Sequence, residues 1–430
     1  MGKQSTQFKF DFLTGFLRIQ ACARARKQIL SLLLASVFFV SQAVAQPLSQ
    51  APLETEEVVV EELIHHSLRI VLDPLSRQIT VEDTISLPAA MQANPLEFAL
   101  HSNLIISNNS GNLRTLSQAP DQSSGSSAIG INSTGGSVAP TNRYFLTPSA
   151  RNREQIVLVY SGEIYDLAEQ NSAEYAQSFS ETSGIISDQG VYLNKASMWI
   201  PDFGDDLLSF DMEVEFADTA RNWTAVSQGD RRGESGENAW QSDEPMEEVY
   251  LIAANFTVYS QQSDDIEVLA YLRQPDPNLA TKYMDATERY LALYEPLLGD
   301  YPFSKFALIE NFWETGYGMP SFTLLGEQVI RFPFILESSY PHEILHNWWG
   351  NGVYPDYNSG NWSEGLTAYL ADHLFQEMEG LGNEYRKEML ARYKNYVADG
   401  NDFPLSEFTS RNSAASQAIG YGKTLMLWHM

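Results

Sequence analysis

Two histidines four residues apart are the side chains of this 430-residue chain best suited to chemistry. His342-Glu343-Ile344-Leu345-His346 puts both imidazoles on one helical face, because four residues at 100° each leave an offset of about 40°. That arrangement can bind one metal ion and is typical of zinc hydrolases. Pro341 suits a first helical turn, Ser339 an N-cap and Gly350 a stop, so we expect a short helix. The alternative is a pair of core histidines, which would be costly to bury beside a carboxylate without a metal.

A catalytic zinc site needs a third protein ligand and one open position for water. The metzincin extension would require Gly at 349 and His at 352, but these positions hold Trp349 and Gly352. Glu364, expected in the first turn of a second helix, is our choice. His373 lies nine residues further on, on the opposite helical face, and we interpret it as structural or exposed. The pattern predicts one Zn²⁺ per chain, held by the two histidines and Glu364.

Glu343 is the predicted general base. It follows the first ligand by one residue, so it can approach a zinc-bound water without binding the metal. Zinc would lower the pKa of that water toward neutrality, and Glu343 would carry its proton to a leaving amine. The residues therefore predict metal-assisted hydrolysis.

The elements that must position these side chains follow from apolar periodicity. From about 58 to 260 apolar residues mostly alternate in short runs, as in 67–72 and 210–216, which predicts antiparallel strands. Within this region, the Ser-, Gly- and Asn-rich segment 108–141 indicates a flexible loop or a loosely held hairpin. After a further strand at 266–271, the segment 278–298 has helical periodicity.

We therefore expect a multidomain β plus α/β chain. The predicted parts are a signal peptide at 1–45, a β-rich domain at 46–263 and a mixed domain at 264–430. The last ten residues open an apolar helix that stops without Gly, Pro or a polar cap. We expect this helix either to dock on the preceding domain or to precede a domain that is missing here.

The N-terminus is typical of a secretory signal. Basic residues within 24–27 precede the apolar run 29–40, which leads to the small residues 43–45. We expect cleavage before Gln46, giving a periplasmic or extracellular protein without stable membrane insertion. The alternative is an uncleaved anchor at 28–46, which approaches the roughly 20 residues of a spanning helix.

Charge and cysteine content exclude several classes of function. Residues 1–45 hold six of the 27 Lys and Arg and one of the 55 Asp and Glu, so the remainder carries 21 basic against 54 acidic residues. The electrostatic field of a chain with this excess of negative charge repels phosphate backbones, and we expect no nucleic-acid partner. The only cysteine, Cys22, precedes the apolar run, so the exported chain would have no disulfide and no cysteine zinc ligand.

On these motifs the chain resembles the alanyl aminopeptidase (aminopeptidase N) family of gluzincin peptidases. The resemblance includes Trp348-Trp349-Gly350-Asn351 after the second histidine and Trp362-Ser363-Glu364-Gly365 around the glutamate. Segments 199–203 and 223–227 are similar to the family's N-terminal saddle domain. The resemblance implies an antiparallel β saddle domain followed by a thermolysin-like zinc domain, with this chain truncated before a helical C-terminal domain.

The resemblance also implies further site residues. Tyr421 matches the family tyrosine whose hydroxyl steadies the oxyanion, although without the family pattern it would be interpreted as a packing aromatic. Gly318 and Met319 match the family's substrate-binding strand. There the family has an acid that pairs with the substrate's amino terminus, whereas this chain has Pro320 and Ser321. Our hypothesis, which rests on proximity in the sequence, is that Glu310 or Glu314, just upstream, supplies that charge.

A second departure is the spacing of the ligands. Between His346 and Glu364 there are 17 residues, where the family usually has 18. The glycine-rich loop can absorb the difference.

These observations predict a zinc metallopeptidase acting on peptides, with aminopeptidase activity as the leading form. One alternative is an endopeptidase or blocked-peptide hydrolase on the same fold, motivated by Pro320 and Ser321. The other is a truncated, non-catalytic module that binds peptides, motivated by the abrupt end at Met430.

Overall fold

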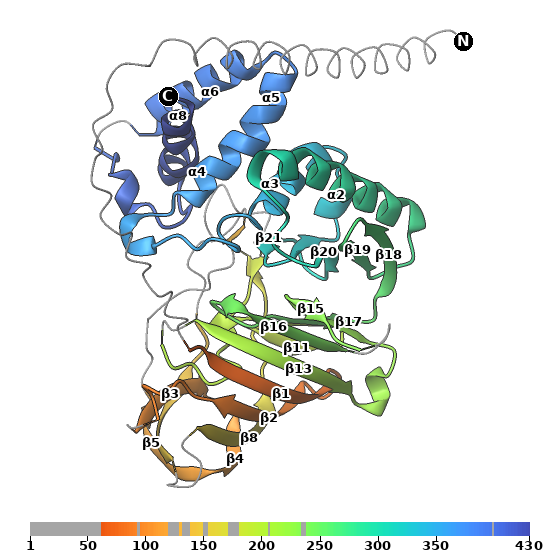
Figure 1. Cartoon of the computed structure of the whole chain (residues 1–430), viewed down its shortest axis with the longest axis vertical. Coiled ribbons are helices and arrows are strands. Elements are labelled where there is room, and N and C mark those ends of the chain that lie inside the picture. The colour runs from red at the N-terminus through yellow and green to blue at the C-terminus, as the bar shows by residue number, and fades with distance from the viewer. Residues whose placement is uncertain are drawn as a thin grey trace, which may run out of the picture. The chain divides into compact units, whose positions relative to one another are not determined.

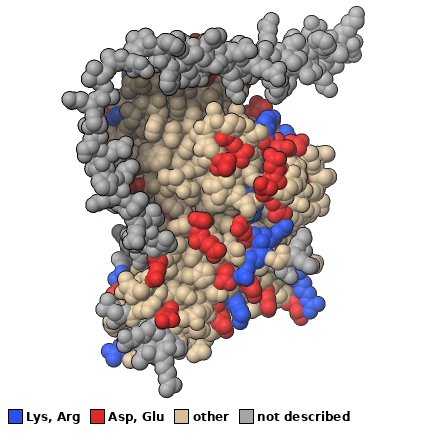
Figure 2. Space-filling model, viewed as in Figure 1, with Lys and Arg blue, Asp and Glu red and all other residues tan. Residues whose placement is uncertain are grey.

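The computed structural model describes residues 62–92, 95–118, 129–130, 138–148, 154–170, 180–204, 207–233, 238–397 and 400–430. The predicted signal at 1–45 and the alternative anchor at 28–46 lie outside these residues. In the described part of the chain, no helix combines the length and the hydrophobicity that membrane crossing requires. Figure 2 shows acidic side chains spread over the visible face, with basic ones in smaller groups, as a net charge of −28 leads one to expect.

Alternating side chains build the largest sheet. In β1, the residues Ile64, Leu68, Ile70 and Leu72 are buried while their neighbours reach solvent, which is the period of a half-buried strand. The predicted antiparallel pairing is confirmed for most of this sheet, although β1 and β13 run parallel. The strand order is β15 (Asp230–Arg231), β16 (Ala239–Met246), β13 (Leu208–Phe216), β1 (Ile64–Asp73), β2 (Gln78–Ser86), β8 (Gln155–Glu163) and β4 (Ile105–Asn109).

Smaller sheets complete the β-rich part of the chain (Figure 1). One contains β3 (Leu96–His101), β7 (Thr141–Pro148) and β5 (Gly111–Gln118); another contains β11 (Ile185–Ser187), β12 (Gly190–Leu193), β17 (Leu251–Ala254) and β14 (Thr224–Val226); a third pairs β10 (Ser180–Glu181) with β9 (Glu169–Gln170). Because β5 pairs with β7, the segment predicted as a loop or hairpin at 108–141 contains a strand at 111–118. Its residues 119–128 and 131–137 lie outside the described residues.

A mixed sheet carries the second half of the chain. Its order is β18 (Thr257–Ser263), β19 (Ile266–Leu272), β20 (Lys305–Asn311), β22 (Phe322–Gly326), β21 (Gly316–Met319) and β6 (Ile129–Gly130). Strands β19, β20 and β22 are parallel, and every residue of β20 is buried. Ala307 and Ile309 join the apolar core shared with the β-rich sheets, whereas Phe306 and Leu308 join the core under the helices. The sheet is thus covered on both faces, as parallel sheets usually are.

Helices cover one face of this sheet (Figure 1). They are α2 (Pro277–Leu298), α3 (Ser339–Leu345), α4 (Ser363–Ala368), α5 (Leu374–Met378), α6 (Gly382–Tyr396), α7 (Ala414–Gln417) and α8 (Thr424–His429), with π-helical segments η7 (Tyr369–His373) and η9 (Ala418–Lys423). Short 3₁₀ turns are η2 (Lys195–Ser197), η3 (Asp218–Ala220), η4 (Val329–Arg331), η5 (Ile335–Glu337), η6 (Tyr357–Ser359) and η8 (Leu405–Glu407). The helix predicted at 278–298 is confirmed as α2, whose apolar face is buried.

The predicted domain boundary at 263/264 falls in the turn between β18 and β19, which pair as a hairpin. The division into two domains stays a prediction.

Candidate metal centre

Helices α3 and α4 bring the three predicted ligands together. His342 and His346 come from α3 and its C-terminal cap, and Glu364 is the second residue of α4. Their candidate ligand atoms all lie within 4.8 Å of one another. Oε2 of Glu364 is 3.4 Å from Nε2 of His342 and 3.6 Å from Nε2 of His346. Two donors held about 2.1 Å from one tetrahedral zinc are about 3.4 Å apart, so the separations fit that ion.

Unpartnered polar atoms also favour a metal here. His346 and Glu364 are almost completely buried. Among the described residues, neither Nε2 of His346 nor Oε1 of Glu364 has a hydrogen-bond partner. Buried polar atoms are rarely left unpaired, and a cation between these side chains would give both atoms a partner.

Electrostatics within the group favour a cation. Burial raises the pKa of Glu364, but the charge of His346 and the hydrogen bond from His342 outweigh it and hold that pKa well below its usual range. Burial lowers the pKa of His342, yet hydrogen bonds to Asp372 and Glu364 raise it overall to about 10. In His346 burial prevails and the pKa is lowered. Positive charge beside Glu364 is therefore stabilised, whether it is carried by a proton or by a metal.

A second layer of contacts orients both imidazoles. Nδ1 of His342 lies 3.4 Å from a carboxylate oxygen of Asp372, and Nδ1 of His346 lies 3.4 Å from the carbonyl oxygen of Trp349. Metal-binding histidines usually donate their other ring N–H to such a group, which fixes the tautomer. The indole Nε1 of Trp349 in turn donates to Oγ1 of Thr367 in α4, 2.7 Å away, and so ties the loop after α3 to the helix that carries Glu364. Asp372 was missed in the sequence because no spacing rule connects it with His342.

Glu343 is buried next to the ligands. It is fully shielded from solvent, and neither of its carboxylate oxygens has a hydrogen-bond partner among the described residues. Burial is the main reason that its pKa is raised to about 8. A carboxylate with such a pKa can both accept and release a proton near neutral pH.

Tyr421 lies beside the same group. It belongs to η9, and its ring is stacked 6.2 Å from the ring of His342. Burial raises the pKa of Tyr421 well above its usual value, with a further contribution from the Glu364 charge. The hydroxyl therefore keeps its proton and can donate a hydrogen bond.

The predicted substrate-binding residues lie in β21. Gly318 and Met319 are in this buried strand, which pairs with β22 on one side and, at Tyr317 and Gly318, with β6 on the other. Oδ1 of Asn347, the residue after His346, accepts a hydrogen bond from the backbone N–H of Ser321 at 2.7 Å. This contact connects the segment after β21 to the end of α3.

The two acids suggested for the substrate amine have other partners. The Glu310 carboxylate binds Arg331 at 2.6 Å and accepts the N–H of Arg273. Glu314 accepts the backbone N–H groups of Gln328 and Val329 at the start of η4. Their role toward a substrate stays a prediction, and these contacts do not favour it.

Two sequence predictions around α3 were wrong in detail. The N-cap is Ser338 rather than Ser339, because η5 ends immediately before it and the helix starts one residue early. The helix ends at Leu345 rather than near Gly350, which instead has φ 96° in a turn. His373 is buried, and its Nε2 is hydrogen-bonded to the Arg386 guanidinium at 2.6 Å. It is not grouped with His342, His346 and Glu364, in agreement with its interpretation as a structural residue.

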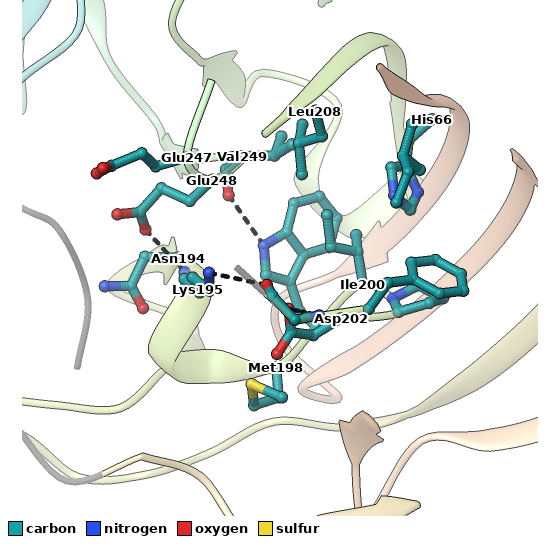
Figure 3. Close-up of a pocket in the computed structure, with 15 residues that line it drawn as sticks. His66, Asn194, Lys195, Met198, Ile200, Asp202, Leu208, Glu247, Glu248 and Val249 are labelled. Atoms are coloured by element: carbon teal, nitrogen blue, oxygen red, sulfur yellow. Dashed lines mark hydrogen bonds between the residues drawn. The ribbon is translucent and has the colours of Figure 1, made fainter. Parts of the chain in front are cut away.

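A recess in the β-rich part is a less suitable site (Figure 3). His66, Lys195 and Asp202 line it, and its volume is about 40 Å³. Ligand pockets are usually about 300–1,000 Å³. Two of its polar groups are already engaged, since Trp199 donates to the carbonyl of Val249 and the backbone N–H of Lys195 donates to a Glu248 carboxylate. We therefore interpret the recess as a packing feature.

Comparison with solved structures identifies the fold. An M1 zinc metallopeptidase from Deinococcus radiodurans matches with a TM-score of 0.58 and 16% identity, covering 86% of this chain and 81% of that one. A mutant of an M1 zinc metallopeptidase from the same organism, bound to a Tyr-Ser-Ala substrate, matches with a TM-score of 0.57 and 15% identity over 86% and 82% of the two chains. Yeast LTA4 hydrolase matches with a TM-score of 0.55 and 13% identity over 85% of this chain and 58% of its own.

No protein-family model matches the sequence, and a comparison with curated proteins finds no significant match. The structural matches confirm the predicted fold class: a β-rich N-terminal part followed by a zinc-peptidase-like part.

Proposed function

From this shared fold we propose that the chain is a zinc-dependent peptidase, acting as an aminopeptidase on peptides with a free amino terminus. The observation that carries the proposal is the convergence of His342, His346 and Glu364 within 4.8 Å beside the buried carboxylate of Glu343. Zinc held by two imidazoles and a carboxylate lowers the pKa of water and polarises a substrate carbonyl.

The chain's own residues would complete the reaction. Glu343 takes a proton from the attacking water and transfers it to the nitrogen of the leaving amine as the carbon–nitrogen bond breaks. The Tyr421 hydroxyl donates a hydrogen bond to the carbonyl oxygen as negative charge develops on it. Asp372 and the Trp349 carbonyl hold the two imidazoles in orientation.

A second candidate is a peptidase that accepts blocked or internal peptide bonds. The observation that favours it lies after Met319, where Pro320 and Ser321 offer no carboxylate for a substrate amine. Glu310 and Glu314 are engaged with other partners.

The test combines metal content with turnover. We expect the purified chain to hold about one zinc per molecule and to cleave a free-amine peptide at least tenfold faster than its N-acetylated form. Glu343→Gln should retain zinc and lose about 10²-fold or more in kcat. Equal rates on both peptides would favour the second candidate. Zinc binding with no turnover on either peptide would contradict both.

A further inference from the structure

A cavity opens beside the metal group, on the side of the C-terminal helices. Its volume is about 720 Å³, within the range of small-ligand pockets. His342, Asp372 and Tyr421 line it, together with residues of α6 and α7. No described residue of β21 lines it. If the amino end of a substrate follows β21, this cavity receives the part that follows the scissile bond.

Two arginines line this cavity, and only one is buried. Arg392 is about half exposed, and its guanidinium donates twice to Glu388 on the same helix, at 3.1 and 2.6 Å. Arg411 is only 8% exposed, and its guanidinium carbon lies 5.7 Å from the centre of the Tyr421 ring. Arg411 is thus a buried cation within reach of the predicted reaction centre.

The backbone around Arg411 is held between the two elements that carry site residues. Before it, the carbonyls of Phe408 and Thr409 accept hydrogen bonds from Asn361, three residues ahead of Glu364. After it, Ser413 and Ser416 form a capping box that starts α7, which continues into η9 and Tyr421. The position of Arg411 relative to the metal ligands is therefore fixed at both ends.

We propose that Arg411 binds a carboxylate of the substrate residue that follows the scissile bond, so that the preferred substrates are short peptides ending close to the cleaved bond. A guanidinium can bind a carboxylate through two parallel hydrogen bonds, which gives both affinity and orientation. In a dipeptide the terminal carboxylate lies about one residue, or roughly 4 Å, beyond the scissile bond. This inference rests on the proposed peptidase function.

The test compares substrates that differ only in this carboxylate. With zinc-loaded protein, kcat/KM is measured for the dipeptide Leu-Ala, for its carboxamide, and for the carboxamide of Leu-Asp. We expect the wild type to prefer the free acid over the carboxamide about tenfold or more. Arg411→Gln should abolish this preference by slowing the free acid alone, Arg411→Lys should keep part of it, and the matched control Arg392→Gln should leave it unchanged. Faster cleavage of Leu-Asp carboxamide than of Leu-Ala carboxamide would assign the site to a side-chain carboxylate as well.

A binding measurement separates this inference from the proposed function. Calorimetry on Glu343→Gln should give a lower Kd for the free acid than for the carboxamide, and Arg411→Gln in that background should equalise the two. Equal kcat/KM for acid and carboxamide in the wild type overturns the inference while the peptidase function stands. Equal losses on both substrates in Arg411→Gln also overturn it, because Arg411 would then act on Tyr421 or Glu343 instead. If the protein neither binds nor cleaves any of these peptides, both proposals are overturned.

Discussion

On the side of His342 that faces away from Glu364, Nδ1 lies 3.4 Å from the Asp372 carboxylate. Replacing Asp372 with Asn keeps the shape but removes the charge that holds the Nδ1 proton of His342. Loss of such a second-layer partner typically weakens metal binding about 10- to 100-fold. We expect this loss in the zinc Kd, measured by competition with a chromogenic chelator.

The matched control for that prediction is Glu379→Gln, which removes one acidic charge from an exposed position just after α5. It should leave the zinc Kd within about twofold, because a surface charge at a distance is screened. Unchanged zinc affinity in Asp372→Asn would show that the contact does not orient the ligand.

Lys305 makes stability depend on pH, because burial disfavours the charged form of its amine. Its side chain is 1% exposed, Nζ donates to Ser321 Oγ at 2.6 Å, and burial lowers its pKa from 10.5 to about 7. The unfolded chain therefore binds more protons than the folded chain between pH 7 and 10.5, so the contribution of Lys305 to stability rises with pH in this window. Relative to Lys305→Met, the free energy of unfolding of the wild type should rise by about 3.5 kcal/mol from pH 7 to 10. Denaturant titrations of both proteins at several pH values measure the difference in their free energies of unfolding. A difference that does not change with pH contradicts the prediction.

The site could be predicted from sequence only where its members obey a local rule. His342, Glu343 and His346 follow from helical periodicity, and Glu364 from its place in a first helical turn. Asp372 contacts His342 because η7 packs against α3, a long-range contact that neither spacing nor propensity encodes.

At the scale of elements, the packing of α4 against α8 leaves no room for a side chain at Gly365. A Cβ there would lie 2.2 Å from Cβ of Thr424 and 2.9 Å from the carbonyl oxygen of Gly420. Gly365→Ala must push the helices apart, next to Glu364 on one side and η9 on the other. We expect a loss of about 1–3 kcal/mol of stability and weaker zinc binding.

Gly422→Ala is the control, because its Cβ would meet only Met389 at 3.9 Å, an ordinary contact. Thermal unfolding of both variants should therefore separate a steric effect from the general consequence of replacing a helical glycine. If the two variants unfold at the same temperature, close helix packing at Gly365 is not limiting.

Long regular elements were predictable and interrupted ones were not. Strands β1 and β13 and helix α2 have clear periods of two or 3.6, which is why their existence could be predicted. The π-helical segments η7 and η9 could not, since one extra residue per turn leaves no compositional signal. Pairing of β6 with β21 joins residues far apart in the chain, and sequence periodicity says nothing about such partners.

At the scale of the whole molecule, the change from alternating to helical periodicity predicted a β-rich part followed by a mixed part. It did not predict that β20 would contribute to both apolar cores, because burial on both faces follows from which sheets and helices pack together. His342, His346 and Glu364 lie on the helices that pack over this shared sheet, so metal binding should increase the stability of the fold.

Removing the metal should therefore destabilise the folded chain. A ligand that binds only the folded state adds about 2.7 kcal/mol when its free concentration is 100 times its Kd. We expect a chelator to lower the unfolding temperature by a few degrees, and added zinc to restore it, in thermal scans followed by circular dichroism. His346→Ala should abolish this shift, since it removes one of the two buried atoms that a metal would satisfy. A chelator effect of the same size in His346→Ala and in wild type would mean that the stabilising ion binds elsewhere.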